Sequence, residues 1–133
     1  MSLIASCHCG ATQIQLPEHP LKGSECNCTF CARLGAIWSY YEPGELIFHA
    51  QDNQRMYSTK PEQKQGYFCA TCGMHIWGSS LDWSSLYNSD GTPKSADANA
   101  VPTKVKHAVN LRLVDGLDWS EIEIEKMDGR NGW

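Results

Sequence analysis

The sequence predicts an all-β protein with many short strands and little helix. Apolar and β-branched residues alternate with polar ones over short segments, and turn-forming residues separate several of these segments. No long segment places apolar residues at positions i, i+3, i+4 and i+7, as an amphipathic helix requires.

The first half of the chain contains four candidate strands. Residues 12–16 alternate, and residues 36–41 are rich in β-branched and aromatic side chains. The Pro43-Gly44 pair then predicts a turn, and residues 46–49 the next strand. Residues 55–59 predict a further short strand.

The second half contains three more candidate strands and a long connection. Strands are expected at residues 74–77, at 105–113, and at 121–125, where glutamates alternate with isoleucines. Residues 81–87 are compatible with a helical turn. Residues 88–102 are rich in Ser, Asp, Asn, Ala, Gly and Pro, which predicts a long loop.

Length and charge limit the function. The 133 residues fit one domain, which we expect to span residues 1–133. The net charge of −4 argues against a nucleic-acid-binding surface, which needs clustered Lys and Arg. No apolar segment is long enough to span a membrane, and the first residues do not resemble a signal peptide. We therefore expect a cytoplasmic protein with reduced thiols.

The seven cysteines are the most informative feature, because they fall into three closely spaced groups. The groups are Cys7-His8-Cys9-Gly10, the CxCxxC run Cys26–Cys31, and Cys69-Ala70-Thr71-Cys72-Gly73. Pairs of thiols at this spacing predict at least one zinc site. Seven thiols divide as four plus three, although spacing alone leaves other pairings of four ligands open.

The CxCxxC run differs from the other two groups. Three thiols within six residues can occupy three corners of one tetrahedron and leave the fourth for water or a substrate, as at catalytic zinc sites. Free buried thiols, a redox-active cluster and an iron–sulfur cluster are the alternatives.

The complete cysteine pattern resembles the glutathione-dependent formaldehyde-activating enzyme family, also called the centromere-protein-V type. The segments that carry the resemblance are Ser6–Ala11, Cys26–Arg33, Phe68–Gly73, Val109–Gly116 and Met127–Gly129. The resemblance implies an Mss4-like fold, a β-tent of antiparallel sheets around a structural zinc. It also implies that Cys7, Cys9, Cys69 and Cys72 hold that zinc. Cys26, Cys28 and Cys31 would form a second, labile zinc site, which can be empty and at which catalysis occurs.

The same resemblance implies a zinc-dependent carbon–sulfur lyase that acts on a thiol adduct. The founding reaction joins glutathione and formaldehyde to give S-hydroxymethylglutathione, so the expected partners are a small thiol and an aldehyde. Asn27 stands where His is common in the family. The alternative is a non-catalytic zinc-binding module for a protein partner.

Other polar and aromatic residues are weaker candidates. Arg33, Arg55 and Arg112 are candidates for the carboxylates of glutathione by charge alone. His8 is expected to point away from the metal, and His49 and His75 to be structural or exposed. Trp38, Trp77 and Trp83 are expected in the core more than around a pocket. Asn110, in an apolar strand, must be hydrogen-bonded if buried.

Overall fold

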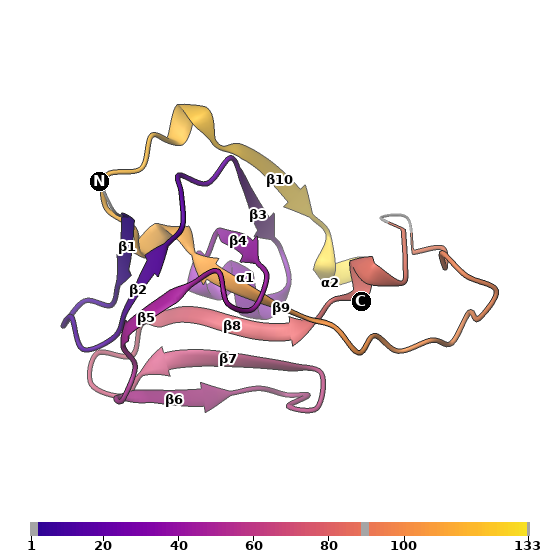
Figure 1. Cartoon of the computed structure of the whole chain (residues 1–133), viewed down its shortest axis with the longest axis horizontal. Helices are drawn as coiled ribbons and strands as arrows, with labels where there is room; N and C mark the ends of the chain where they lie inside the picture. Colours follow the sequence, from indigo (N-terminus) through magenta and orange to yellow (C-terminus); the bar gives the residue numbers. More distant parts are fainter. Residues whose placement is uncertain (1–2, 89–90, 133) are drawn as a thin grey trace.

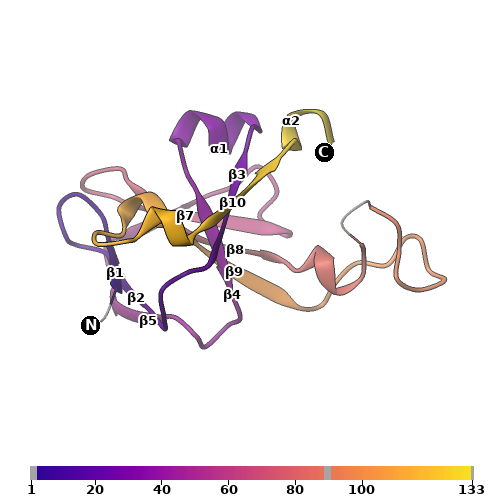
Figure 2. The same ribbon diagram turned by 90° about the horizontal axis from the view of Figure 1, so that it is seen from above.

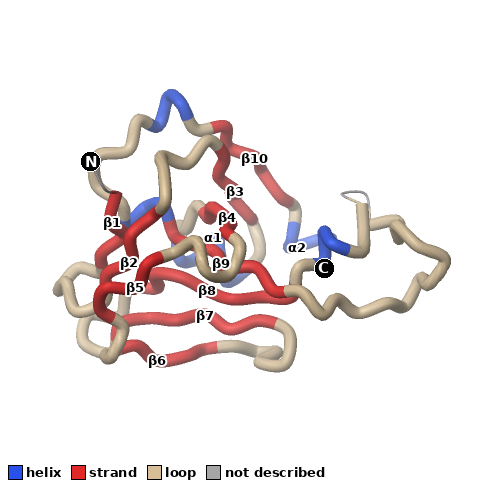
Figure 3. Tube along the Cα trace, in the orientation of Figure 1, coloured by secondary structure: helices blue, strands red, loops and turns tan. Residues whose placement is uncertain are grey.

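The computed structural model describes residues 3–88 and 91–132 of the chain. Figure 1 shows the order of the elements, and Figure 3 shows how little of the chain is helical. The strands are β1 (Leu3–Ser6), β2 (Gln13–Leu16), β3 (Lys22–Cys26), β4 (Trp38–Tyr41), β5 (Ile47–Ala50), β6 (Gln54–Tyr57), β7 (Lys64–Cys69), β8 (His75–Leu81), β9 (Val105–Asn110) and β10 (Glu123–Met127). The helices are α1 (Thr29–Leu34) and α2 (Gly129–Gly132), with 3₁₀ turns at Trp83–Ser85, Leu111–Leu113 and Trp119–Glu121. The all-β class is confirmed.

The strands form two sheets. A three-stranded sheet has the order β1-β2-β5, and a seven-stranded sheet has the order β10-β3-β4-β9-β8-β7-β6. The strand pairs are antiparallel except for β10 and β3, which run parallel with Met127 opposite Cys26. Strand β10 therefore ends beside Cys26, the first cysteine of the CxCxxC run.

The main core lies between the two sheets. Ile14, Ile76 and Val109 are completely buried there, and Ala5 and Leu16 of the small sheet are also in the cluster. Alternation along β2 explains this, since Ile14 and Leu16 point inward while Gln13 and Gln15 are half-buried.

Several elements differ in length from the sequence prediction, and others were not predicted. The predicted strand at 105–113 ends at Asn110 and turns into a 3₁₀ helix at Leu111–Leu113. The predicted helical turn within 81–87 is present as the 3₁₀ helix at Trp83–Ser85. Strands β1, β3 and β7 and the helices α1 and α2 were not predicted from the sequence.

The long connection after residue 87 contains little regular structure. Residues 91–104 extend away from both sheets in Figures 1 and 2. Residues 89 and 90 of the expected loop 88–102 lie outside the described residues. The helices in the described part of the chain are too short and polar to cross a membrane.

Asn110 joins three segments around α1 and the start of β8. Its side chain is 5 % exposed. Its Oδ1 accepts hydrogen bonds from the backbone N–H groups of Ile37 (3.4 Å) and Arg112 (3.1 Å), and its Nδ2 donates to the carbonyl of His75 (3.2 Å). The expectation that a buried Asn110 is hydrogen-bonded is therefore confirmed.

Replacing Asn110 with leucine is expected to destabilise the fold by roughly 2–4 kcal/mol, because it leaves two N–H groups and one carbonyl without this partner. Urea unfolding followed by tryptophan fluorescence measures the change. The matched control is Asn99→Leu in the exposed loop, for which we expect about 0.5 kcal/mol or less. Equal stabilities of the two variants would contradict the assigned role of Asn110.

Candidate metal centres

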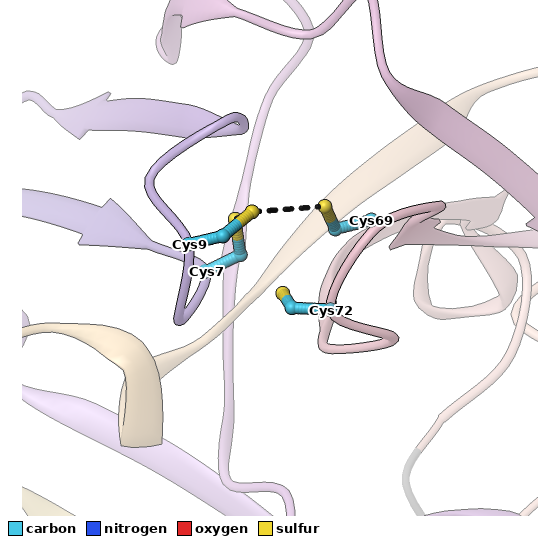
Figure 4. A group of neighbouring side chains, drawn as sticks. All are labelled: Cys7, Cys9, Cys69 and Cys72. Carbon is cyan, nitrogen blue, oxygen red and sulfur yellow. Dashed lines mark hydrogen bonds between the residues drawn. The ribbon is translucent and has the colours of Figure 1, made fainter.

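Four cysteines from two distant segments converge in the first centre, which we call the four-cysteine group (Cys7, Cys9, Cys69 and Cys72). Figure 4 shows the sulfurs facing one another across the gap between the two loops. The Sγ atoms all lie within 4.8 Å of one another, and those of Cys7 and Cys9 are 3.7 Å apart. The Cys9 and Cys69 sulfurs are 3.6 Å apart. A tetrahedral zinc with Zn–S bonds of about 2.3 Å needs S–S separations of about 3.8 Å, so the geometry fits one such ion.

Two tight turns produce this arrangement. Cys7 and Cys9 follow β1, and Cys69 ends β7, with Cys72 in the turn before β8. Gly10 and Gly73 follow the second cysteine of each pair with φ of 81° and 80°, a conformation that glycine adopts without strain. The N–H of Gly10 donates to the carbonyl of Cys7, and that of Gly73 to the carbonyl of Cys69.

Backbone N–H groups surround these sulfurs. The N–H of Thr12 donates to the Cys7 Sγ at 3.3 Å. Donation from the N–H of Cys72 is the main cause that lowers the pKa of Cys69 to about 6. Hydrogen bonds to the charged form favour a thiolate, and thiolate is the form that binds metal.

The second centre, the three-cysteine group (Cys26, Cys28 and Cys31), is built from one continuous segment. Cys26 ends β3, Cys28 is the N-cap of α1, and Cys31 is the third residue of that helix. The three Sγ atoms lie within 4.8 Å of one another, so the group can place three sulfurs around one ion. Cys28 and Cys31 are half-buried, in contrast to the buried Cys26.

Each sulfur of the three-cysteine group accepts an N–H. The Cys26 Sγ accepts from the backbone N–H of Cys28 at 3.4 Å, and the Cys28 Sγ from that of Cys31 at 3.3 Å. The Cys31 Sγ accepts from the indole Nε1–H of Trp38 at 3.3 Å. This donor set stabilises negative sulfurs.

The pKa values of the two half-buried thiols are shifted in opposite directions. Burial raises the pKa of Cys28, but the backbone N–H of Cys31 and further hydrogen bonds outweigh it, so the net pKa is lowered. Burial raises the pKa of Cys31 to about 12, although the N–H of Trp38 opposes the shift. Of these two, Cys28 is therefore the thiol that ionises more easily.

Aromatic side chains adjoin the three-cysteine group. Phe30, between Cys28 and Cys31 in sequence, meets the ring of His75 edge-on at 5.3 Å and stacks with Tyr57 at 6.0 Å. Burial lowers the pKa of His75, which keeps the ring neutral, and its buried Nδ1 has no hydrogen-bond partner in the described structure. We expected His75 to be structural or exposed from the sequence, and the structure places its ring against Phe30, which lies between two cysteines of the group.

A cavity of about 320 Å³ lies beside α1. Leu34 and Gly35 at the end of α1 line it, together with Gly73 and His75. Arg112 also lines it, and its Nε donates to the carbonyl of Gly35 at 3.2 Å. The cavity is therefore next to the helix that carries Cys31, and its lining also includes Gly73, which directly follows Cys72.

We assign the remaining sequence candidates no role at either centre, although Arg33 and His8 are close in sequence to the cysteines. Arg33 is exposed on α1 and Arg55 is exposed on β6. His8 is exposed, and the Nε2 of His49 bonds to Gln15 Oε1. Trp77 is buried in the core, as expected, whereas Trp83 is 42 % exposed.

The sequence predicted the burial of Trp38 but not its contact with a cysteine. Trp38 is buried, as expected of a strand aromatic, but its indole N–H contacts a cysteine sulfur. No sequence pattern indicates this contact.

The fold and the two cysteine groups define an all-β protein with two candidate metal centres. The family model for the glutathione-dependent formaldehyde-activating enzyme matches residues 2–92, more than half of the chain, and this range contains all seven cysteines. The chain belongs to this family. Its all-β architecture agrees with the Mss4-like fold that the resemblance implied.

A solved structure gives a second comparison. The crystal structure of a Rhodobacter sphaeroides protein is similar to this chain with a TM-score of 0.61 and 22 % sequence identity. The similarity covers 92 % of this chain and 99 % of that protein. At this identity the likeness shows the fold. Comparison with curated proteins gives no match.

Proposed function

We propose that the chain is a zinc-dependent enzyme of the carbon–sulfur lyase type that acts on a thiol adduct. The reaction that best fits the family is addition of glutathione to formaldehyde, giving S-hydroxymethylglutathione. In that direction a bond forms between the thiol sulfur and the aldehyde carbon, and the thiol proton passes to the aldehyde oxygen. The reverse reaction breaks the same carbon–sulfur bond.

The observation that carries the proposal is the unequal number of ligands in the two centres. The four-cysteine group offers four sulfurs at tetrahedral spacing, which suits a closed structural site. The three-cysteine group offers three, and its half-buried Cys28 leaves the group accessible from solvent. Three protein ligands with one open position are typical of catalytic zinc.

The residues of the chain have distinct tasks in this proposal. Cys26, Cys28 and Cys31 would hold zinc, which can polarise an aldehyde oxygen or bind a substrate thiol as thiolate. Trp38 holds the Cys31 sulfur in place through its N–H. Arg112 supplies a positive charge at the adjacent cavity, where it can face a substrate carboxylate.

Metal content and a direct assay test the proposal together. Elemental analysis of the purified protein is expected to give two zinc ions per chain. NMR should then show faster formation of the hydroxymethyl adduct from glutathione and ¹³C-formaldehyde than with protein stripped of metal by a chelator. A single zinc and no acceleration with any thiol would contradict the proposal and favour the partner-binding module.

A further inference from the structure

The loop of the three-cysteine group is held by a segment far away in the sequence. Strand β10 runs parallel to β3 and ends with Met127 opposite Cys26, so the residues after each strand continue side by side. Figure 2 shows α1 and α2 next to each other on the same side of the molecule. We call residues 127–130 the clasp segment.

Asn27, between the first two cysteines, uses all its hydrogen-bonding groups on the clasp segment. Its backbone N–H donates to the carbonyl of Met127 at 3.1 Å, and its Nδ2 donates to Asp128 Oδ1 at 2.9 Å. Its Oδ1 accepts from the backbone N–H of Arg130 at 2.9 Å, and its carbonyl accepts from the Arg130 Nε at 2.9 Å. Four contacts on one exposed residue leave its backbone little freedom to rotate.

The contact with Arg130 also orients a cysteine. The carbonyl of Asn27 and the N–H of Cys28 belong to the same planar peptide unit and point in opposite directions. When Arg130 holds the carbonyl, the N–H is directed to the other side, where it donates to the Cys26 Sγ at 3.4 Å. The clasp segment thus determines the direction of a hydrogen bond to a candidate ligand.

Asp128 is itself fixed in position. Its carboxylate accepts from the backbone N–H of Asn131 at 3.3 Å and from the Asn131 Nδ2 at 3.0 and 3.1 Å. The Asn27 contact is therefore made to a group already held at the start of α2.

We propose that the clasp segment is a positioning element that preorganises Cys26, Cys28 and Cys31 and so sets how tightly their metal is retained. The inference rests on the proposed second zinc site. Partners that orient metal ligands typically change metal affinity by about 10- to 100-fold when they are mutated. We expect a change of this size when the contacts to Asn27 are removed.

The test compares metal release from wild type with that from Asp128→Ala, Arg130→Ala and Asp128→Asn. Asparagine keeps an oxygen that can accept from Asn27 Nδ2 and from Asn131, so Asp128→Asn is the conservative variant. Asp118→Ala is the matched control, because Asp118 caps a surface 3₁₀ helix through Ser120 and makes no hydrogen bond to either cysteine group among the described residues. Each protein is loaded with Co²⁺, and its thiolate-to-cobalt absorption is followed after addition of a chelator.

We expect Asp128→Ala and Arg130→Ala to release one of their two metals about 10- to 100-fold faster than wild type. The other metal should be retained, and the melting temperature of both variants should be close to that of Asp118→Ala. Asp128→Asn should release the metal of the three-cysteine group at a rate close to wild type. Wild-type release rates in both alanine variants would overturn the inference alone. Loss of both metals together in these variants would also overturn it, since the clasp segment would then serve general stability. A wild-type protein that binds one metal would instead overturn the proposed function, and this inference with it.

Discussion

Replacing Cys69 with serine is expected to unfold most of the protein at 25 °C. Cys69 is completely buried and lies at the end of β7, where it faces the loop that follows β1. A structural zinc bound by four thiolates contributes roughly 10–16 kcal/mol to folding, whereas a typical domain is stable by about 5–15 kcal/mol. A serine hydroxyl is a poor replacement for a thiolate ligand, so most of the stabilisation from the metal should be lost.

Circular dichroism and one-dimensional NMR of Cys69→Ser measure this effect. Wild type treated with a strong chelator should lose its folded signals in the same way, which links the loss to the metal. A folded Cys69→Ser protein that melts within a few degrees of wild type would show that the four-cysteine group does not hold a structural metal.

Cys28→Ser is expected to have the opposite consequence, with the fold kept and activity lost. Cys28 caps α1, since its Sγ accepts from the backbone N–H of Cys31. Serine is one of the preferred N-cap residues, so its Oγ can make the same hydrogen bond and keep the helix. The substitution therefore removes a metal ligand with little effect on local structure. Because changes in residues that merely support a ligand reduce activity by about 10- to 100-fold, losing the ligand itself should reduce it by at least about 100-fold.

Zinc analysis of Cys28→Ser should show a decrease from two ions per chain to one, with a melting curve similar to that of wild type. Cys69→Ser is the matched comparison, since it makes the same chemical change in the other centre. Two zinc ions and full activity in Cys28→Ser would rule out the three-cysteine group as the site of catalysis.

The sequence identified the strands whose alternation is strong and missed those that depend on their neighbours. The apolar alternation at residues 12–16 and 121–125 was sufficient to predict β2 and β10, although β10 begins and ends two residues later, at Glu123 and Met127. Strand β3 has the sequence Lys-Gly-Ser-Glu-Cys and little apolar character. It is a strand because β4 and β10 flank it. Its Gly23 gives room to the side chains of Ile37 and Ile124, which a Cβ at this position would meet at 2.8 and 3.2 Å.

Helix α1 was missed because it is short and has no buried residues. Its limits are set locally instead, by the Cys28 cap at the start and by Gly35 in the left-handed conformation at the end. These signals are visible in the sequence once the helix is known, but a six-residue segment without an apolar face does not predict a helix.

The sequence showed the division of the cysteines but not their surroundings. Close spacing grouped the thiols into four plus three, and the family resemblance supplied the pairing of Cys7 and Cys9 with Cys69 and Cys72, which the structure brings together. The contact of Trp38 with Cys31 depends on how β4 packs against α1. The contacts between Asn27 and Arg130 join residues 103 positions apart, and the spacing of residues in one sequence does not reveal them.

The distance in sequence between the two centres and the clasp segment also has a consequence for biosynthesis. Protein chains emerge from the ribosome from the N-terminus onward, at about 5–20 residues per second, and early regions begin to fold first. The ligands from Cys7 to Cys72 are all available before residues 127–130 have been made. We therefore expect the nascent chain to acquire its first zinc while Asn27 still lacks its partners. The second metal would reach its full affinity only after the clasp segment has been synthesised and has docked beside Cys26.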